Sequence, residues 1–272
     1  MTAATVVQGR RGSVLQRAMH AEWTKLRTLP GTVWLFFAII TVTAAVSAAS
    51  SASVTCASTG CGQDPARVAL AGVGLGQALV AVLAVHVISG EYSTGLICTT
   101  LIAMPSRTTV LGAKAVIVTA VVAAAGTIAV LASAVSGRIL LPGRGFTPTH
   151  GYQPLSLGDG QYLRAAGGSV LYLVLIALLS LGIATAVRDA ATSIGIVLGL
   201  LYLVPIIAGA VDDPRWHRRL DQIGPMNAGL AIQNTVDVAG WPLSPWAGLG
   251  VLTCWSAASL LAGGLLLWSR DT

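Results

Sequence analysis

Six stretches of about 20 residues each contain no Asp, Glu, Lys or Arg. A helix of that length crosses roughly 30 Å of hydrocarbon, so each stretch is long enough to span a membrane. The chain is 54% hydrophobic and only 10% charged, which is more apolar than one water-soluble core can hide. The sequence therefore predicts an all-α membrane protein with six transmembrane helices. The expected spans are Val33–Ala52, Val68–Ser89, Ala115–Val135, Ala166–Val187, Thr192–Val211 and Trp246–Trp268.

The first span also has features of a signal peptide, because Arg10, Arg11 and Arg17 precede it and small residues follow it. The polar lead of about thirty residues is too long for the charged region of a signal peptide. We therefore interpret the run as a transmembrane helix.

Small residues and one proline predict how the spans pack. The sequences G-V-G-L-G at Gly72–Gly76 and G-I-V-L-G at Gly195–Gly199 are expected to let neighbouring helices approach closely. Pro205, in the fifth span, is expected to kink its helix without ending it.

Basic residues near the spans indicate the orientation, because cytoplasmic loops carry an excess of Lys and Arg. With a cytoplasmic N-terminus, nine of the 16 Lys and Arg residues fall inside and seven outside. The cluster before the first span carries most weight. We therefore expect both termini in the cytoplasm, residues 1–30 as a cytoplasmic segment and residues 31–272 as the membrane domain. The outer loops then cover about residues 53–67, 137–165 and 212–245.

The segment before the first span is expected to form an amphipathic helix on the membrane surface. Its apolar residues recur at spacings of four, four and three, and its basic residues fall largely elsewhere on the helical wheel. The apolar residues are Leu15, Met19, Trp23 and Leu26, and the basic ones are Arg17, Lys25 and Arg27. Pro30 and Gly31 end the pattern. The alternative is a polar lead that is simply solvated.

Two outer loops have features of their own. Cys56 and Cys61, in V-T-C-A-S-T-G-C-G, lie in the first outer loop, where they can form a short-loop disulfide or stay free. In the last outer loop, Asp212–Pro214 predicts a helix start with proline in the first turn. That helix is expected to lie at the membrane interface as a lid over the pathway.

Several classes of function are excluded by what the sequence lacks. No carboxylate lies within a span to bind a coupling ion, and His86 is interpreted as a helix-packing or interfacial residue and not as a proton carrier. The motifs of membrane metalloproteases, of α/β-hydrolases and of P-loop ATPases are missing. No basic helix with interleaved aromatics indicates nucleic acid, and no metal-ligand spacing surrounds His150. We therefore expect no enzyme and no cofactor in this chain, so any work it performs is powered by a partner.

The chain has only two glutamates, and one of them, Glu91, ends the second span. The residues from Glu91 to Met104 can form a short helix with apolar residues on one stripe, which Pro105 ends. A carboxylate at position 91 can cap that helix and pair with a basic group on a neighbouring segment. The alternative is a charged residue that only flanks a span.

The segment E-Y-S-T-G-L-I-C-T-T-L-I-A-M-P-S-R-T-T-V-L-G-A-K resembles the one after the second span in permeases of type 2 ATP-binding-cassette (ABC) exporters. The bacitracin and lantibiotic resistance branch of that family shows E-[YF]-x-x-G-T-x-R-x-x-L, then a proline, an arginine and a lysine. The matching residues are Glu91, Tyr92, Gly95, Leu101, Pro105, Arg107 and Lys114. Leu96 and Cys98 stand where the family has threonine and arginine, so no basic residue is present at position 98.

Two further segments resemble the same family. H-A-E-W-T-K-L-R-T-L at His20–Leu29, with Glu22, Trp23, Lys25 and Arg27, is similar to the elbow helix that lies on the membrane surface. G-P-M-N-A-G-L-A-I at Gly224–Ile232 is similar to the outer segment before the last span. With the six-span layout, the resemblance covers nearly the whole chain.

The resemblance implies an exporter permease in the bacterial cytoplasmic membrane, of the kind associated with multidrug or antibiotic resistance. Such permeases pair with a second copy or a paralogue and bind two copies of an ABC ATPase, which holds the ATP and Mg. The segment of about 91–105 would be the coupling helix, and the elbow helix would help to dock the ATPase. Charge-free spans favour a hydrophobic or amphipathic substrate such as a natural product, peptide or lipid. The alternative is a membrane sensor or assembly subunit that transports nothing.

Overall fold

The structure is a computed structural model that describes residues 24, 30–56, 62–93, 107–152, 158–236 and 243–269, with only the backbone of 91–93 and 107–108. Within those ranges the chain is helical and has no strand. Six helices are long and apolar enough to cross a membrane, as the sequence predicts. Five of them are α2 (Pro30–Ser53), α4 (Val73–Ser93), α6 (Arg107–Leu140), α7 (Gly160–Val187) and α12 (Pro245–Ser269). The sixth combines α8 (Ala190–Leu198), the π-helical turn η3 (Gly199–Leu203) and α9 (Val204–Ala210).

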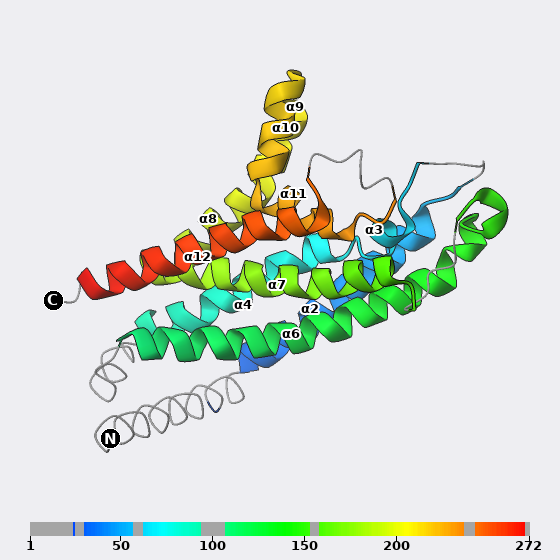
Figure 1. Ribbon diagram of the computed structural model, residues 1–272. Coiled ribbons are helices and arrows are strands. Elements are labelled where there is room, and N and C mark those ends of the chain that lie inside the picture. The colour runs from blue at the N-terminus through cyan, green and yellow to red at the C-terminus, as the bar shows by residue number, and fades with distance from the viewer. Residues whose placement is uncertain are drawn as a thin grey trace, which may run out of the picture.

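The long helices form an elongated bundle around α7, which packs against α12, α4 and α6 (Figure 1). Helix α2 packs on α6 and α4 at the side of the bundle. The start of α2 and the end of α12 lie at the same end of the bundle, which we call the terminal end. The opposite end, called the loop end, carries the short elements between the spans. They are α3 (Pro65–Ala69), η1 (Pro142–Arg144), η2 (Pro148–His150), α10 (Pro214–Ile223), α11 (Pro225–Leu230) and η4 (Ala231–Gln233).

Glycines allow close helix contacts in part of the bundle. A Cβ added at Gly72 would lie 1.9 Å from the Thr43 carbonyl oxygen, and one at Gly76 would lie 2.1 Å from Thr43 Oγ1. The prediction of close packing is therefore confirmed at Gly72–Gly76. It is wrong for Gly195 and Gly199, which have no neighbouring atom within 4 Å of an added Cβ, because this part of the fifth span faces outward.

The fifth span bends where its hydrogen-bond pattern changes. Residues Gly199–Leu203 form a π-helical turn, and Pro205 follows directly. Both features interrupt the regular ladder of an α-helix and are common causes of kinks. Beyond this point α9 and α10 stand out from the bundle to one side (Figure 1).

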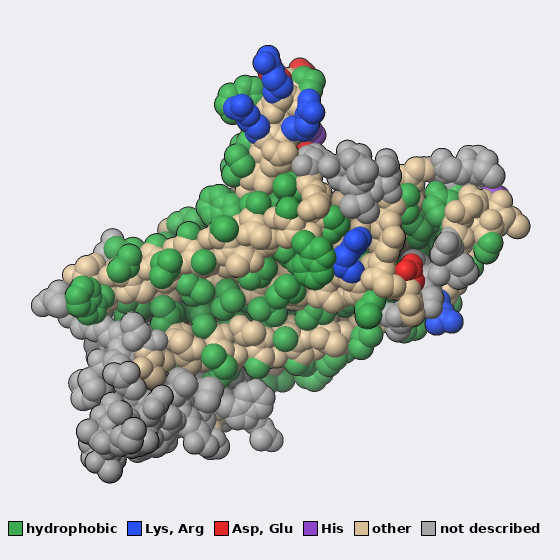
Figure 2. All heavy atoms as spheres, viewed as in Figure 1, with side chains coloured by type: hydrophobic (Ala, Val, Ile, Leu, Met, Phe, Trp, Pro, Cys, Tyr) green, Lys and Arg blue, Asp and Glu red, His purple; other side chains and the backbone are tan. Residues whose placement is uncertain are grey.

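Helix α10 begins where the sequence predicts a helix after the fifth span. Asp213 caps it by accepting a hydrogen bond from the Arg215 amide at 2.8 Å, and Pro214 occupies the first turn. None of its residues is buried, and Trp216 and Ile223 are 57% and 59% exposed. Basic side chains surround the end of this projection (Figure 2). A helix with this pattern, lying across the direction of the spans, suits a membrane interface.

A small apolar cap covers the loop end beside α3. It consists of Cys56, Val68, Ala69, Leu141 and Phe146. The Cys56 amide donates to the Arg144 carbonyl at 2.8 Å, which holds the end of α2 against η1. Cys56 is disulfide-bonded. Its predicted pairing with Cys61 stays a prediction, because Cys61 lies outside the described residues.

Candidate functional site

Seven of the residues predicted for ATPase coupling or for the elbow helix lie outside the described ranges. They are Gly95, Leu101 and Pro105 of the coupling motif, and Glu22, Trp23, Lys25 and Arg27 of the elbow helix. The structure does place Glu91, Tyr92, Arg107 and Lys114, which flank the segment 94–106 on both sides.

Helix α4 extends further than the sequence analysis expects. It ends at Ser93, so Glu91 and Tyr92 belong to its last turn. An N-cap residue has a non-helical backbone, which Glu91 does not have, so the expected cap of a separate short helix is not supported. The C-terminal end of a helix carries partial negative charge, which makes a basic partner favourable for a carboxylate at this position. The pairing role of Glu91 therefore stays a prediction. Residues 91–93 belong to α4 and not to the expected coupling helix of about 91–105, and the rest of that segment lies outside the described residues.

Lys114 joins α6 to the end of α4. Its side chain is only 1% exposed, and Nζ donates to the Val87 carbonyl oxygen at 3.4 Å. Val87 lies one turn before Glu91, within the last two turns of α4. The structure thus brings Lys114, from the predicted motif, against α4 near its C-terminal end. His86, on the same part of α4, is exposed on the outside of the bundle, which favours the interfacial interpretation over helix packing within this chain.

The next connection at the terminal end is a tight turn between α7 and α8. Arg188 ends α7 in the left-handed conformation at φ 66°. Asp189 then caps α8 by accepting a hydrogen bond from the Thr192 amide at 2.8 Å. Hydrogen bonds from the Thr192 side chain and backbone lower the pKa of Asp189 below its ordinary value. Helix α7 is therefore joined to α8 by a tight turn and not by a long loop.

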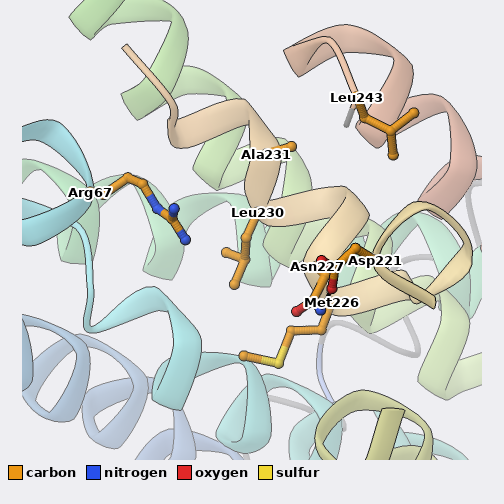
Figure 3. A pocket seen from close by; sticks show the side chains of 7 residues that line it. All are labelled: Arg67, Asp221, Met226, Asn227, Leu230, Ala231 and Leu243. Carbon is orange, nitrogen blue, oxygen red and sulfur yellow. Dashed lines mark hydrogen bonds between the residues drawn. The ribbon is translucent and has the colours of Figure 1, made fainter. Parts of the chain in front are cut away.

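The loop end contains a cavity of about 280 Å³ (Figure 3). Its walls come from α3, from α10 and α11 with the start of η4, and from Leu243 before α12. Its lining residues are Arg67, Asp221, Met226, Asn227, Leu230, Ala231 and Leu243. Figure 3 shows the Arg67 guanidinium on one side and Asp221 with Asn227 on the other. The cavity therefore has a cationic wall, an anionic wall and apolar side chains between them.

Asp64 positions the cationic wall. It caps α3 by accepting from the Ala66 amide at 2.9 Å, and Pro65 follows in the first turn. The same carboxylate accepts from Thr235 Oγ1 at 2.7 Å and from the Val236 amide at 3.0 Å, which joins α3 to the residues after η4. Burial lowers the pKa of the Arg67 guanidinium, and the nearby Asp64 carboxylate opposes this shift. Arg67 remains a cation, because an arginine side chain is effectively always protonated in proteins.

The anionic wall is held by hydrogen bonds between α10 and α11. Asn227 Nδ2 donates to Asp221 Oδ1 at 2.6 Å. His217 Nε2 lies 3.3 Å from Asp221 Oδ2, and His217 Nδ1 lies 2.8 Å from the Ala208 carbonyl oxygen. These contacts fix the carboxylate at the rim of the cavity while α10 stays outside the bundle.

Met226 connects the cavity to the interior of the bundle. Gln77 Nε2, on α4, donates to Met226 Sδ at 3.1 Å and to the Gly74 carbonyl at 3.0 Å. The Tyr172 hydroxyl, on α7, donates to Gln77 Oε1, and Tyr202 in η3 donates to the Gly74 carbonyl at 2.6 Å. Polar groups within a membrane domain need internal partners, and this network supplies them.

The sequence analysis did not select Arg67, Asp221 or Gln77. Gln77 could have been found, because an amide inside an apolar span marks a position that needs a partner. Arg67 and Asp221 carry no such local signal, since charged residues are ordinary in loops.

No known family model matches the chain, and no curated protein matches it significantly. The fold defines its class, which is a multi-pass α-helical membrane protein with six spans. The motif around Glu91 resembles that of exporter permeases, and this resemblance supports the function proposed below.

Proposed function

We propose that the chain is the membrane permease of an ATP-driven exporter of the type 2 ABC class, in the bacterial cytoplasmic membrane. The observation that carries the proposal is the Lys114 contact. Helices α4 and α6 flank the segment with the exporter-like motif, and the Lys114 contact holds these two helices together. An ATPase that binds this segment could therefore transmit its conformational change to α4 and α6 together.

The shape of α4 supports the same proposal. One helix runs from Gln77, next to the loop-end cavity, to Glu91 at the terminal end. A rigid helix that contacts both ends of a bundle can transmit a displacement between them. ATP and Mg belong to two copies of a partner ATPase, and a second permease, identical or paralogous, completes the pathway.

The proposed substrate is hydrophobic or amphipathic. The spans place no carboxylate in the membrane interior, so a strongly charged solute would lose its hydration without compensation. A hydrophobic or amphipathic natural product, peptide or lipid, entering from the membrane or the cytoplasm, avoids this desolvation cost.

The test is to search the neighbouring genes for a P-loop ATPase, to co-express that ATPase with this chain, and to purify the proteins and reconstitute them into vesicles. We expect a stable complex and ATP-dependent movement of an amphipathic fluorescent substrate. An ATPase variant with its P-loop lysine replaced is the control and should abolish movement. If no ATPase co-purifies and no compound moves with ATP, the exporter assignment is wrong.

The second candidate is a membrane sensor that transports nothing. The charged cavity at the loop end favours it, because a ligand can be detected there without crossing the bundle. A sensor would change its association with a partner when ligand is added, yet the same vesicles would show no ATP-dependent transport.

A further inference from the structure

We propose that α10 binds the phosphate groups of phospholipids in the membrane that surrounds the spans. Arg218 and Arg219, together with Arg215, donate hydrogen bonds to the phosphates, and apolar side chains of the same helix lie against the first part of the acyl chains. The inference rests on α10 and not on the exporter motif, so it goes beyond the proposed function and can be tested without an ATPase.

Helix α10 is attached to the rest of the protein by one side. His217 Nδ1 lies 2.8 Å from the Ala208 carbonyl oxygen near the end of α9. Asp221 Oδ1 accepts a hydrogen bond from Asn227 of α11 at 2.6 Å. These contacts hold α10 by the side that carries His217 and Asp221.

The arginines lie mainly on the other side of α10. A helix turns by about 100° per residue, so Arg215 and Arg219 lie opposite His217, and Arg218 lies between the two sides. All three arginines are exposed, and Figure 2 shows basic side chains around the end of the projection formed by α9 and α10. Helix α10 therefore presents guanidinium groups away from the contacts that hold it.

An apolar stripe runs along α10 beside Arg219. It consists of Trp216, Leu220 and Ile223, at spacings of four and three. Trp216 and Ile223 are 57% and 59% exposed, although contact of large apolar side chains with water is unfavourable. Placing an arginine in the hydrocarbon is also unfavourable, whereas the stripe is stabilised there. Both conditions are met where the headgroups of the bilayer meet its acyl chains.

The contacts that the arginines make leave hydrogen-bond donors for a phosphate. Arg218 Nε donates to the Pro214 carbonyl oxygen at 3.4 Å, and Arg219 Cζ lies 5.6 Å from the centre of the Trp216 ring. A guanidinium has five N–H donors in a planar fork, so one contact of this kind does not use its capacity. Such a fork pairs with a phosphate through two parallel hydrogen bonds.

Acidic residues near the start of α10 limit the role of net charge. Residues 212–223 contain three arginines and three aspartates, so their formal charge is zero with histidine neutral. Arg215 Nε lies 3.9 Å from Asp213 Oδ1 in an exposed pair, and such pairs contribute little. The proposal therefore depends on directed pairing, mainly by Arg218 and Arg219. We expect phosphatidylglycerol to be preferred over phosphatidylcholine, because the ammonium group of phosphatidylcholine competes for its own phosphate.

The test measures contact between Trp216 and lipid in the full-length protein. The protein is reconstituted into phosphatidylcholine vesicles with a fixed fraction of a brominated lipid, which quenches nearby tryptophan. The brominated lipid is either phosphatidylglycerol or phosphatidylcholine with the same acyl chains. The chain has seven tryptophans, so the signal of Trp216 is the difference between the protein with and without Trp216→Phe. We expect phosphatidylglycerol to associate about threefold or more strongly than phosphatidylcholine.

The variants test whether the guanidinium groups cause this preference. Arg218→Gln combined with Arg219→Gln should remove it, and each single change should remove part of it. Arg218→Lys with Arg219→Lys keeps the charge without the fork and should show a weaker preference than arginine. Arg144→Gln changes an exposed arginine elsewhere at the loop end and is the matched control. Because no residue of α10 is buried, these changes should leave the fold intact, which size-exclusion profiles check.

Several outcomes would overturn the proposal. Equal quenching by the two brominated lipids, or an unchanged preference in the double glutamine or double lysine variant, would contradict pairing of the guanidinium forks with lipid phosphate. No quenching of Trp216 by either lipid would mean that protein covers α10, as a second copy or another subunit. Loss of the preference with inorganic phosphate, but not with chloride at the same ionic strength, would indicate a site for the free ion. If the double variant does not fold, the single variants and the comparison of the two lipids still decide. Failure here leaves the exporter proposal intact, because no step depends on ATP.

Discussion

Lys114 is the one basic residue of the predicted coupling motif whose side-chain contact is described. Buried cations near the end of a span are costly unless they are paired, and this one meets the Val87 carbonyl. Replacing a buried ion by an apolar side chain of similar size is often neutral for stability. Under the proposed exporter function, we therefore expect the lysine to contribute more to coupling between α4 and α6 than to folding.

We predict that Lys114→Met leaves insertion and thermal stability nearly unchanged but weakens substrate-stimulated ATP hydrolysis and transport about fivefold or more. Glu91→Ala and a change at Arg107 should act in the same direction while the ATPase still binds. The measurements are ATPase activity and transport of reconstituted complexes at matched levels. Arg144→Ala, at the loop end, is the control. Equal activity of Lys114→Met and the unchanged complex would make the lysine only a span flank.

At the scale of single elements, the pairing of α7 with α12 depends on two glycines. A Cβ at Gly182 would lie 2.5 Å from the backbone carbon of Ser259, and one at Gly263 would lie 2.6 Å from the Gly182 carbonyl oxygen. Real Cβ atoms do not approach backbone so closely, so any side chain here would push the two helices apart. Close approach of backbones is a general basis of helix association in membranes.

We predict that Gly182→Ala destabilises the protein by about 1–3 kcal/mol through overpacking. Gly195→Ala is the matched control, because it adds the same methyl group where no atom lies within 4 Å. In a helix that change should be neutral or stabilising by up to about 1 kcal/mol. Thermal unfolding in one detergent compares the two variants, and the reverse order of stability would contradict the close contact of α7 and α12.

At the scale of the whole molecule, six spans place the start of α2 and the end of α12 at one end of the bundle. The loop end carries the charged cavity, the apolar cap and α10, whereas the terminal end carries Lys114 and the turn at Asp189. The small excess of basic residues predicts that the terminal end faces the cytoplasm.

This orientation can be tested with single cysteines introduced at exposed positions. In intact cells, Arg144→Cys should react with a membrane-impermeant maleimide, and Ala191→Cys should react only after the membrane is opened. Labelling is measured relative to the unchanged chain, which accounts for the native cysteines. The opposite pattern would invert the topology and place the charged cavity in the cytoplasm.

The sequence determined the six spans, because partition between lipid and water depends on the local run of side chains and needs no knowledge of the fold. It also determined the start of α10, since Asp213 and Pro214 act on the adjacent turn. It could not place the bend of the fifth span at Gly199–Leu203 or the continuation of α4 through Glu91. A helix boundary within an apolar run depends on contacts with neighbouring helices that no local pattern records.

The loop-end cavity could not be predicted from the sequence, because it forms only in the tertiary structure. Arg67 and Asp221 come from different connections between the spans, and they face one space because Asp64 holds α3 to Thr235 while Asn227 holds α10 to α11. Gln77 likewise meets Met226 from 149 residues away. Such contacts form between segments that the bundle brings together, so their geometry is set by packing and hydrogen bonding over the whole chain and not by the spacing of residues along it.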